Sequence, residues 1–137
     1  MSDKPYRPAG NRHHVVIIGS GFGGLFAARE LDGADVDVTL ISRTNFHLFP
    51  PLLYQVATGI LGSGEIATST RQILGKQKNT DIMRGDVTDI DLDAKTVTCK
   101  EGPYTYTYEY DSLIVAAGAG QSYFGNDHFA EFAPGLK

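Results

Sequence analysis

The chain has 137 residues, a single cysteine and a formal net charge of −4 at neutral pH. This length suits one domain, or part of one, whose core buries roughly two thirds of the unfolded surface. The single Cys99 excludes an intrachain disulfide, a cysteine-based zinc site and a cysteine-ligated iron–sulfur cluster. An acidic balance without a basic run argues against nucleic acid as a partner.

No apolar run approaches the ~20 residues that span a bilayer, and no charged-then-apolar leader opens the chain. We therefore expect a soluble, cytoplasmic chain. Residues 1–12 are polar and are expected to form a disordered lead-in. His13 and His14 follow, and they are expected in solvent or at the entry to a strand, because no further metal ligands lie nearby in the sequence.

The stretch after these histidines predicts a strand, a glycine turn and a helix. Val15–Ile18 are four β-formers, typical of the first strand of a parallel sheet, buried on both faces. Gly19, Gly21 and Gly24 follow in the spacing G-x-G-x-x-G, and a helix is predicted from Leu25. The first glycine permits the tight turn, the second admits a pyrophosphate to the backbone, and the third lets the helix pack close to the strand. The alternative is a glycine turn without a ligand.

A second strand is predicted at residues 36–41, after the first helix ends near Gly33. The short crossover makes the two strands parallel neighbours. Dinucleotide folds usually place Asp or Glu after this strand, where the carboxylate accepts hydrogen bonds from ribose hydroxyls. This chain has Ser42 and Arg43 there. A serine can bond a ribose hydroxyl, and an arginine can stack on adenine or meet a 2′-phosphate, so an NADP-like ligand stays open.

Two helices are predicted in the middle of the chain. Paired prolines at 50 and 51 stop any continuous helix. Beyond them, residues 52–60 predict a short helix whose apolar face points inward. Residues 63–74 predict a further helix that Ser63 caps and Gly75 ends.

The last third of the chain predicts strands. Residues 81–91 predict a strand with a break near Gly85, and the alternating residues 96–100 and 104–110 predict a hairpin. The hairpin tyrosines are expected on a half-buried sheet face, and Cys99 is expected to be a small strand residue. Residues 110–120 predict one more buried strand, whose small residues at its carboxyl end let a ligand approach the backbone. The remaining residues show no periodic element.

These elements, with the late segment YDSLIVAAGA, together resemble the first half of the two-dinucleotide-binding flavoproteins. In that superfamily the late strand typically ends in Ala-Thr-Gly, where this chain has Ala116-Ala117-Gly118. Disulfide reductases of the superfamily carry a redox cysteine pair after the second strand, whereas this chain has HLFPPLLYQVATG there. That segment and residues 110–137 are similar to type II NADH dehydrogenase, the single-subunit NADH:quinone oxidoreductase. The similarity covers nearly everything from His13 to Lys137.

The resemblance implies an α/β, Rossmann-like FAD/NAD(P)-binding three-layer fold, with a parallel sheet plus a β-hairpin, incomplete in this chain. It implies FAD as the cofactor, and it assigns no catalytic or metal-ligating residue. His47 and Glu65 are the nearest polar candidates, and both are expected to be structural. The implied FAD-binding residues are Gly19, Gly21, Phe22, Gly23 and Gly24 at the pyrophosphate, Ser42 and Arg43 at the ribose and adenine, Val87 at the adenine, Pro51 and Leu53 near the isoalloxazine, and Ala117 and Gly118 beside the cofactor.

The resemblance also implies a boundary. Residues 13–137 would be the amino-terminal part of the FAD-binding domain, ending before an NADH-binding domain. NADH, quinone and the cytoplasmic face of the cell membrane would then be partners of a full-length parent only, and a homodimer is allowed. The expected function is the FAD-binding part of an oxidoreductase that transfers electrons from NADH through FAD to a membrane quinone, inactive alone.

Two other functions stay open. One is a non-catalytic nucleotide-binding module or partner subunit. The other is a short-chain dehydrogenase that acts directly on NAD(P), which is disfavoured because its glycine pattern differs and its Tyr-x-x-x-Lys motif is absent around the hairpin tyrosines.

Overall fold

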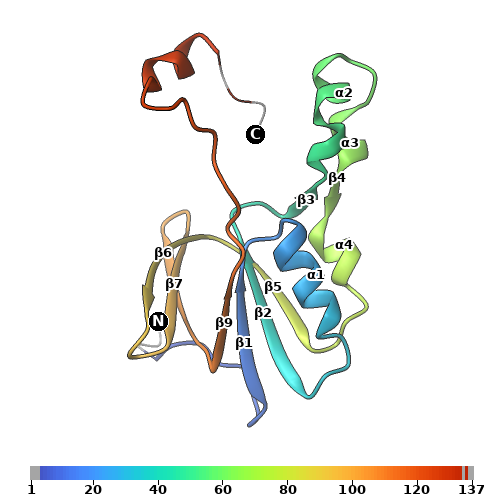
Figure 1. The fold of residues 1–137 in the computed structure, drawn as a ribbon. Helices are drawn as coiled ribbons and strands as arrows, with labels where there is room; N and C mark the ends of the chain where they lie inside the picture. The colour runs from blue at the N-terminus through green and yellow to red at the C-terminus, as the bar shows by residue number, and fades with distance from the viewer. Residues whose placement is uncertain (1–3, 134, 136–137) are drawn as a thin grey trace.

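The centre of the molecule is a parallel sheet, seen in a computed structural model that describes residues 4–133 and 135. Its strand order is β5-β2-β1-β9 (Figure 1). The predicted neighbours β1 and β2 are parallel, with Ile18 opposite Ile41 at their carboxyl ends. The strands are β1 (His13–Ile18), β2 (Val36–Ser42), β5 (Thr80–Arg84) and β9 (Ser112–Val115).

Each face of this sheet is covered by a different layer. On one face lie α1 (Phe22–Glu30) and α4 (Thr70–Leu74), and on the other an antiparallel sheet of order β6-β7-β8. Those strands are β6 (Asp86–Asp91), β7 (Thr96–Glu101) and β8 (Tyr104–Glu109). The α/β, three-layer, Rossmann-like fold with its hairpin is therefore confirmed.

The two cores are built from alternate residues of the same strands. Val15 and Ile17 of β1 pack toward the helices, whereas Val16 and Ile18 pack toward the antiparallel sheet. All four side chains are buried, as expected for a central strand of a parallel sheet. Tyr108, from the hairpin, joins the second core at 3% exposure.

The predicted strand at 81–91 divides at Gly85, as expected. β5 lies in the parallel sheet and β6 in the antiparallel one, so the break moves the chain from one layer to the next. A Cβ at Gly85 would lie 3.0 Å from the Cys99 sulfur, so a side chain at this crossing would require its neighbours to shift. Burial raises the pKa of the Cys99 thiol to about 11, and the charge of Glu101 adds to that shift. This thiol stays protonated at neutral pH, consistent with a structural strand residue.

Residues 46–69 form an arm that projects beyond the carboxyl ends of the parallel strands (Figure 1). The arm begins with β3, ends with β4, and these two short strands pair antiparallel. It contains β3 (Phe46–Leu48), the 3₁₀ turn η1 (Pro50–Leu52), α2 (Leu53–Ala57), α3 (Ser63–Ile66) and β4 (Ala67–Ser69).

The arm corrects two predictions. The single helix at 63–74 is wrong, because α3 ends at Ile66, residues 67–69 pair with β3, and α4 begins only at Thr70. Thr68 and Ser69 have low helix propensity, and here they pair with β3 instead. Gly62, not Ser63, is the N-cap of α3, while the predicted end at Gly75 is confirmed.

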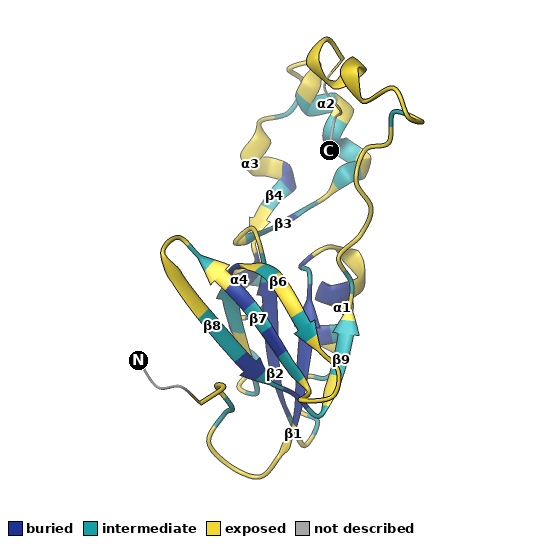
Figure 2. Ribbon diagram, turned by 90° about the vertical axis from the view of Figure 1, so that its left-hand side faces the viewer, coloured by how far each residue is buried: buried dark blue, intermediate teal, exposed yellow. Residues whose placement is uncertain are grey.

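The prediction that the helix after the prolines points its apolar face inward is also wrong. The helix exists as α2, but it buries no residue, and Tyr54 is 60% exposed. The arm carries α2 away from both cores, so its apolar residues Leu53 and Val56 stay half-buried and join neither core (Figure 2).

The last strand is less buried than its sequence predicts. β9 lies at the edge of the sheet, and Val115 is 62% exposed because the described residues provide no further strand beside it. The chain then leaves the body and forms the short 3₁₀ turn η2 (Asp127–Glu131), with Phe132 at 79% exposure. Within the described part of the chain, no helix is long and apolar enough to cross a membrane.

The expectation of a disordered lead-in does not hold at Tyr6 and Arg7. The Tyr6 N–H donates to the Thr107 carbonyl at 2.6 Å, and Tyr6 forms a parallel bridge with Tyr108. Arg7 makes ion pairs with Glu109, at 3.1 Å, and with Asp111. The lead-in thus joins β8 to the segment that begins β9.

Replacing Arg7 with alanine is expected to lower the free energy of unfolding by about 1 kcal/mol, because a partly exposed charge network contributes little more than that. The measurement is urea unfolding at neutral pH. The control is Arg84→Ala, which removes a single ion pair to Glu101 from a side chain that is 58% exposed, and it should cost less. An equal loss in both variants would contradict this expectation, because the two ion pairs of the lead-in would then add no more stability than one exposed pair.

Candidate functional site

A cavity of about 370 Å³ lies across the carboxyl ends of all four parallel strands. Ligands of open α/β sheets bind at this edge. Residues following each strand reach the cavity in the order of the sheet. They are Gly85, Asp86 and Val87 after β5, Ser42, Arg43 and Thr44 at β2, Gly19, Ser20, Gly21 and Phe22 after β1, and Ala116, Ala117 and Gly118 after β9.

The glycine turn closes one wall of the cavity, and two of its glycines act as the sequence predicts. Gly19 has φ of +102°, and a Cβ there would lie 2.3 Å from the Ala116 carbonyl oxygen. A Cβ on Gly24 would lie 1.8 Å from the Gly19 carbonyl oxygen, so only glycine allows this approach of helix to turn. A Cβ on Gly21 would meet nothing within 4 Å, because this position faces open space.

The amino terminus of α1 lies at this cavity, because Gly21 and Phe22 line it. The helix starts at Phe22, three residues before the predicted Leu25, so more of the glycine turn belongs to it. The N-cap is Gly21, no side chain caps the helix, and its first turn holds no acidic residue. The first N–H groups of a helix have no intrahelical partner, and the helix dipole favours an anion there.

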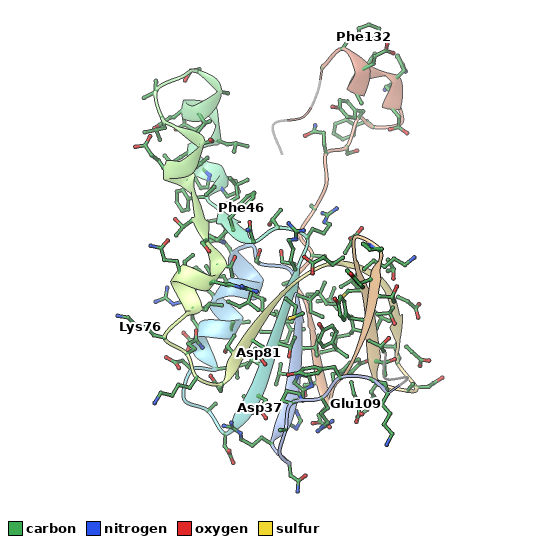
Figure 3. The ribbon with its side chains drawn as sticks, turned by 180° about the vertical axis from the view of Figure 1, so that it is seen from behind. Asp37, Phe46, Lys76, Asp81, Glu109 and Phe132 are labelled. Atoms are coloured by element: carbon green, nitrogen blue, oxygen red, sulfur yellow. The ribbon has the colours of Figure 1, made fainter. Side chains whose placement is uncertain are left out.

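Polar contacts tie the arm to the glycine turn. The hydroxyls of Ser20 and Ser42 lie 2.8 Å apart, which joins the turn to the end of β2. The buried His47 lies within the arm, and its Nδ1 donates to the Ser20 carbonyl at 2.9 Å. The Phe22 ring packs edge-on against His47, with ring centres 5.0 Å apart. Figure 3 shows Phe46 at the base of the arm, at the opposite end of the sheet from Glu109.

Two opposite charges line the β2 and β5 end of the cavity. Arg43 follows Ser42, and Asp86 follows Gly85. Both are exposed, and among the described residues neither side chain makes a hydrogen bond or an ion pair.

The structure brings most of the predicted nucleotide-site residues to the cavity. Those that line it are Gly19, Gly21, Phe22, Ser42, Arg43, Val87, Ala117 and Gly118. Gly23 and Gly24 lie behind this wall, in the first turn of α1, and Gly24 is buried against the turn. Pro51 and Leu53 lie in the arm outside the lining, where Phe46, Leu48 and Pro50 line the cavity instead.

Sequence reasoning missed some lining residues, of which Ser20, Thr44 and Asp86 carry polar side chains. Ser20 lies inside the glycine motif, and its place between the first two glycines is the sequence feature that could have identified it as a lining residue. Asp86 carries a weaker signal, because it follows a glycine at the predicted strand break.

His47 and Glu65, the polar candidates of the arm, have structural partners. His47 bonds the Ser20 carbonyl, and Glu65 accepts a hydrogen bond from the Gly62 N–H at 2.6 Å. Across residues 4–133 and 135, no three His, Cys, Asp or Glu side chains gather closely enough to hold a metal ion.

Comparisons with known proteins agree with this fold and site. The type II NADH:quinone oxidoreductases Ndh and NdhA of Mycobacterium tuberculosis are each 66% identical to this chain, over 92% and 93% of its length. The resemblance to type II NADH dehydrogenase is thereby confirmed. The chain spans only 27% of each of these relatives.

Solved structures show the same likeness. NDH2 of Plasmodium falciparum in complex with NADH matches 84% of this chain and 24% of its own, with a TM-score of 0.77 and 30% identity. The sulfide:quinone oxidoreductase of Aquifex aeolicus matches 81% of this chain and 25% of its own, with a TM-score of 0.71 and 32% identity. A family model described as pyridine nucleotide-disulphide oxidoreductase matches residues 13–134. With nearly its whole length matched, the chain belongs to the pyridine nucleotide-disulphide oxidoreductase family.

Proposed function

We propose that this chain binds FAD and forms the FAD-binding part of a flavoprotein oxidoreductase that passes electrons from NADH to a membrane quinone. The names of the two mycobacterial relatives support the reaction class. The observation that carries the proposal is the uncapped amino terminus of α1, which faces a cavity spanning four strand ends.

The residues of the cavity fit a dinucleotide in three respects. Gly21 leaves open space where a side chain would stand, so an anion can approach the backbone. The cavity volume of about 370 Å³ falls within the range of ligand sites. Residues that follow all four parallel strands line the cavity, which gives an extended ligand contacts at each strand end.

The family resemblance implies a direction for the cofactor along this cavity. Gly21, Phe22 and Gly23 would hold the pyrophosphate, and the β2 and β5 ends would hold the adenosine half. The second half would then pass Ala117 and Gly118 toward the base of the arm. That Pro51 and Leu53 lie near the isoalloxazine stays a prediction, because it needs a ligand that reaches further into the arm than the lining residues do.

Bound FAD would supply the redox chemistry, as the cofactor does in flavoproteins. The chain's own residues bind and orient. The α1 N–H groups offset the negative charge of the phosphates, the Ser20–Ser42 contact fixes the turn against β2, and His47 holds the arm to the turn. No acid, base or nucleophile is assigned to this chain. Its inactivity alone, membrane contact and dimerisation stay predictions.

Titration of the purified chain with FAD is expected to quench flavin fluorescence and raise the melting temperature, since a ligand at 100 times its Kd stabilises by about 2.7 kcal/mol. Gly21→Val is expected to abolish both effects, because its side chain would fill the phosphate space. The control is Gly64→Val. A Cβ at Gly64 would also meet no atom within 4 Å, but this residue lies in α3, outside the cavity.

The outcomes separate the candidate functions. Binding of ADP without binding of FAD would favour the non-catalytic nucleotide-binding module. Absence of both would contradict the proposal for this chain. If FAD binds, NADH oxidation can be measured with and without the rest of a relative supplied as a separate chain, which tests the expected inactivity alone.

A further inference from the structure

We propose that Asp86 supplies the ribose-binding carboxylate that this chain lacks at the end of β2, so that the site selects an adenosine with a free 2′-hydroxyl over one with a 2′-phosphate. The inference rests on the proposed dinucleotide site, and it resolves the choice that Ser42 and Arg43 leave open.

The ends of β2 and β5 place Asp86 beside the expected ribose position. Ser42 lies opposite Arg84 in the parallel ladder, and the Gly85 N–H donates to the Ser42 carbonyl at 2.9 Å. Asp86 therefore follows a residue that is bonded directly to the end of β2. Both Asp86 and Ser42 line the same cavity.

Ser42 is a poor substitute for the missing carboxylate. Its hydroxyl lies 2.8 Å from that of Ser20, and as a neutral oxygen it accepts a weaker hydrogen bond than a carboxylate oxygen does. Ser42 can position the turn, but a charged acceptor would have to come from another residue.

Asp86 has its carboxylate available for this role. Lys100 lies opposite it in the antiparallel ladder, and Arg84 is its near neighbour in the chain. No ion pair within the described residues joins Asp86 to Lys100, and Arg84 pairs with Glu101 at 2.9 Å instead. An exposed carboxylate without a partner can accept a hydrogen bond from a ribose hydroxyl without first breaking another interaction in the protein.

Arg43 on the same rim does not reverse the preference. A 2′-phosphate would be attracted by Arg43 and repelled by Asp86, and these effects offset each other to first order. What remains is the hydrogen bond, because a dianionic phosphate donates none to the carboxylate whereas a hydroxyl does. Free ribose is therefore favoured, and Arg43 is left to contact the adenine.

Two matched ligand pairs test the proposal by calorimetry with the 137-residue chain. ADP is compared with 2′-deoxy-ADP, and ADP-ribose with its 2′-phosphate. The first member of each pair is expected to bind about tenfold more tightly, which corresponds to about 1.4 kcal/mol. In Asp86→Ala both ratios are expected to fall toward one, mainly through weaker binding of ADP and ADP-ribose.

The control is Asp89→Ala, which removes the same charge from the same strand at an exposed residue that does not line the cavity. It should keep both ratios, and a thermal melt of each variant confirms folding. Unchanged ratios in Asp86→Ala, or equal weakening of all four ligands, would overturn the role of Asp86 and leave the dinucleotide site standing. If the unaltered chain binds none of the four, the proposed function fails and this inference fails with it.

Discussion

Replacing Gly24 with alanine is expected to lower the free energy of unfolding by about 3 kcal/mol, at the upper end for overpacking a close contact. The new Cβ would lie 1.8 Å from the Gly19 carbonyl oxygen, which is a backbone atom and has no rotamer to change. The whole of α1 would have to move away from the turn. Alanine's better helix propensity, worth roughly 1 kcal/mol, is too small to offset that displacement.

Gly23→Ala is the matched control for this experiment. Its Cβ would lie 3.5 Å from the Ala116 Cβ, an ordinary contact, and the residue is also in the first turn of α1. Chemical unfolding of both variants should therefore show a large loss for Gly24→Ala and a small gain for Gly23→Ala. A similar effect for both would mean that the turn is more adaptable than its geometry indicates.

Acidification below pH 6.5 is expected to destabilise the chain through His14. This histidine is fully buried between β2 and the end of β8, and its Nε2 lies 2.8 Å from the Thr39 hydroxyl. Its Nδ1 donates to the Glu109 carbonyl, so Nε2 is unprotonated and accepts from Thr39. Burial is the main reason that the pKa of His14 lies below its usual 6.5, and the charge of Arg7 adds to it.

Because folding lowers the pKa of His14, this residue makes the folded chain less stable as the pH falls. Below pH 6.5 the unfolded chain takes up a proton at this position while the folded chain resists it, so stability is present above that pH and is lost as pH falls. Asp111 adds a separate loss at lower pH. Its pKa is held below 3.8 by hydrogen bonds from the His14 N–H and from Arg7, so its contribution disappears only as pH falls through that range.

Urea unfolding at pH 7.5 and pH 5.5 measures the effect of His14. His14→Ala is expected to cost about 3 kcal/mol at the higher pH, because it leaves a cavity and unpartnered polar groups. The variant should also lose most of the stability difference between the two pH values. His13→Ala, at the exposed neighbouring residue, should retain that difference, and an unchanged difference in His14→Ala would contradict the assignment.

Elements whose causes are local could be predicted from the residues alone. The apolar run of β1, the three glycines of the turn and the start of a helix all lie within residues 15–25, and the contact that requires Gly24, with the Gly19 carbonyl oxygen, lies inside that unit. The hairpin and the break at Gly85 could also be predicted, because the alternation of side chains and the placement of glycines specify them within a few residues. The nucleotide-site positions at Gly21, Ser42 and Gly118 follow from where these strands end.

Tertiary structure alone decided the features that depend on distant partners. Residues 67–69 became a strand because β3 lies beside them, and α2 joined neither core because the arm carries it away from both. His14 was buried by Thr39 and Glu109, which lie 25 and 95 residues away in the chain. Asp86 reached the cavity because β5 pairs with β2. Periodicity reports which face of an element is apolar, but only the packing of distant segments decides whether that face is covered.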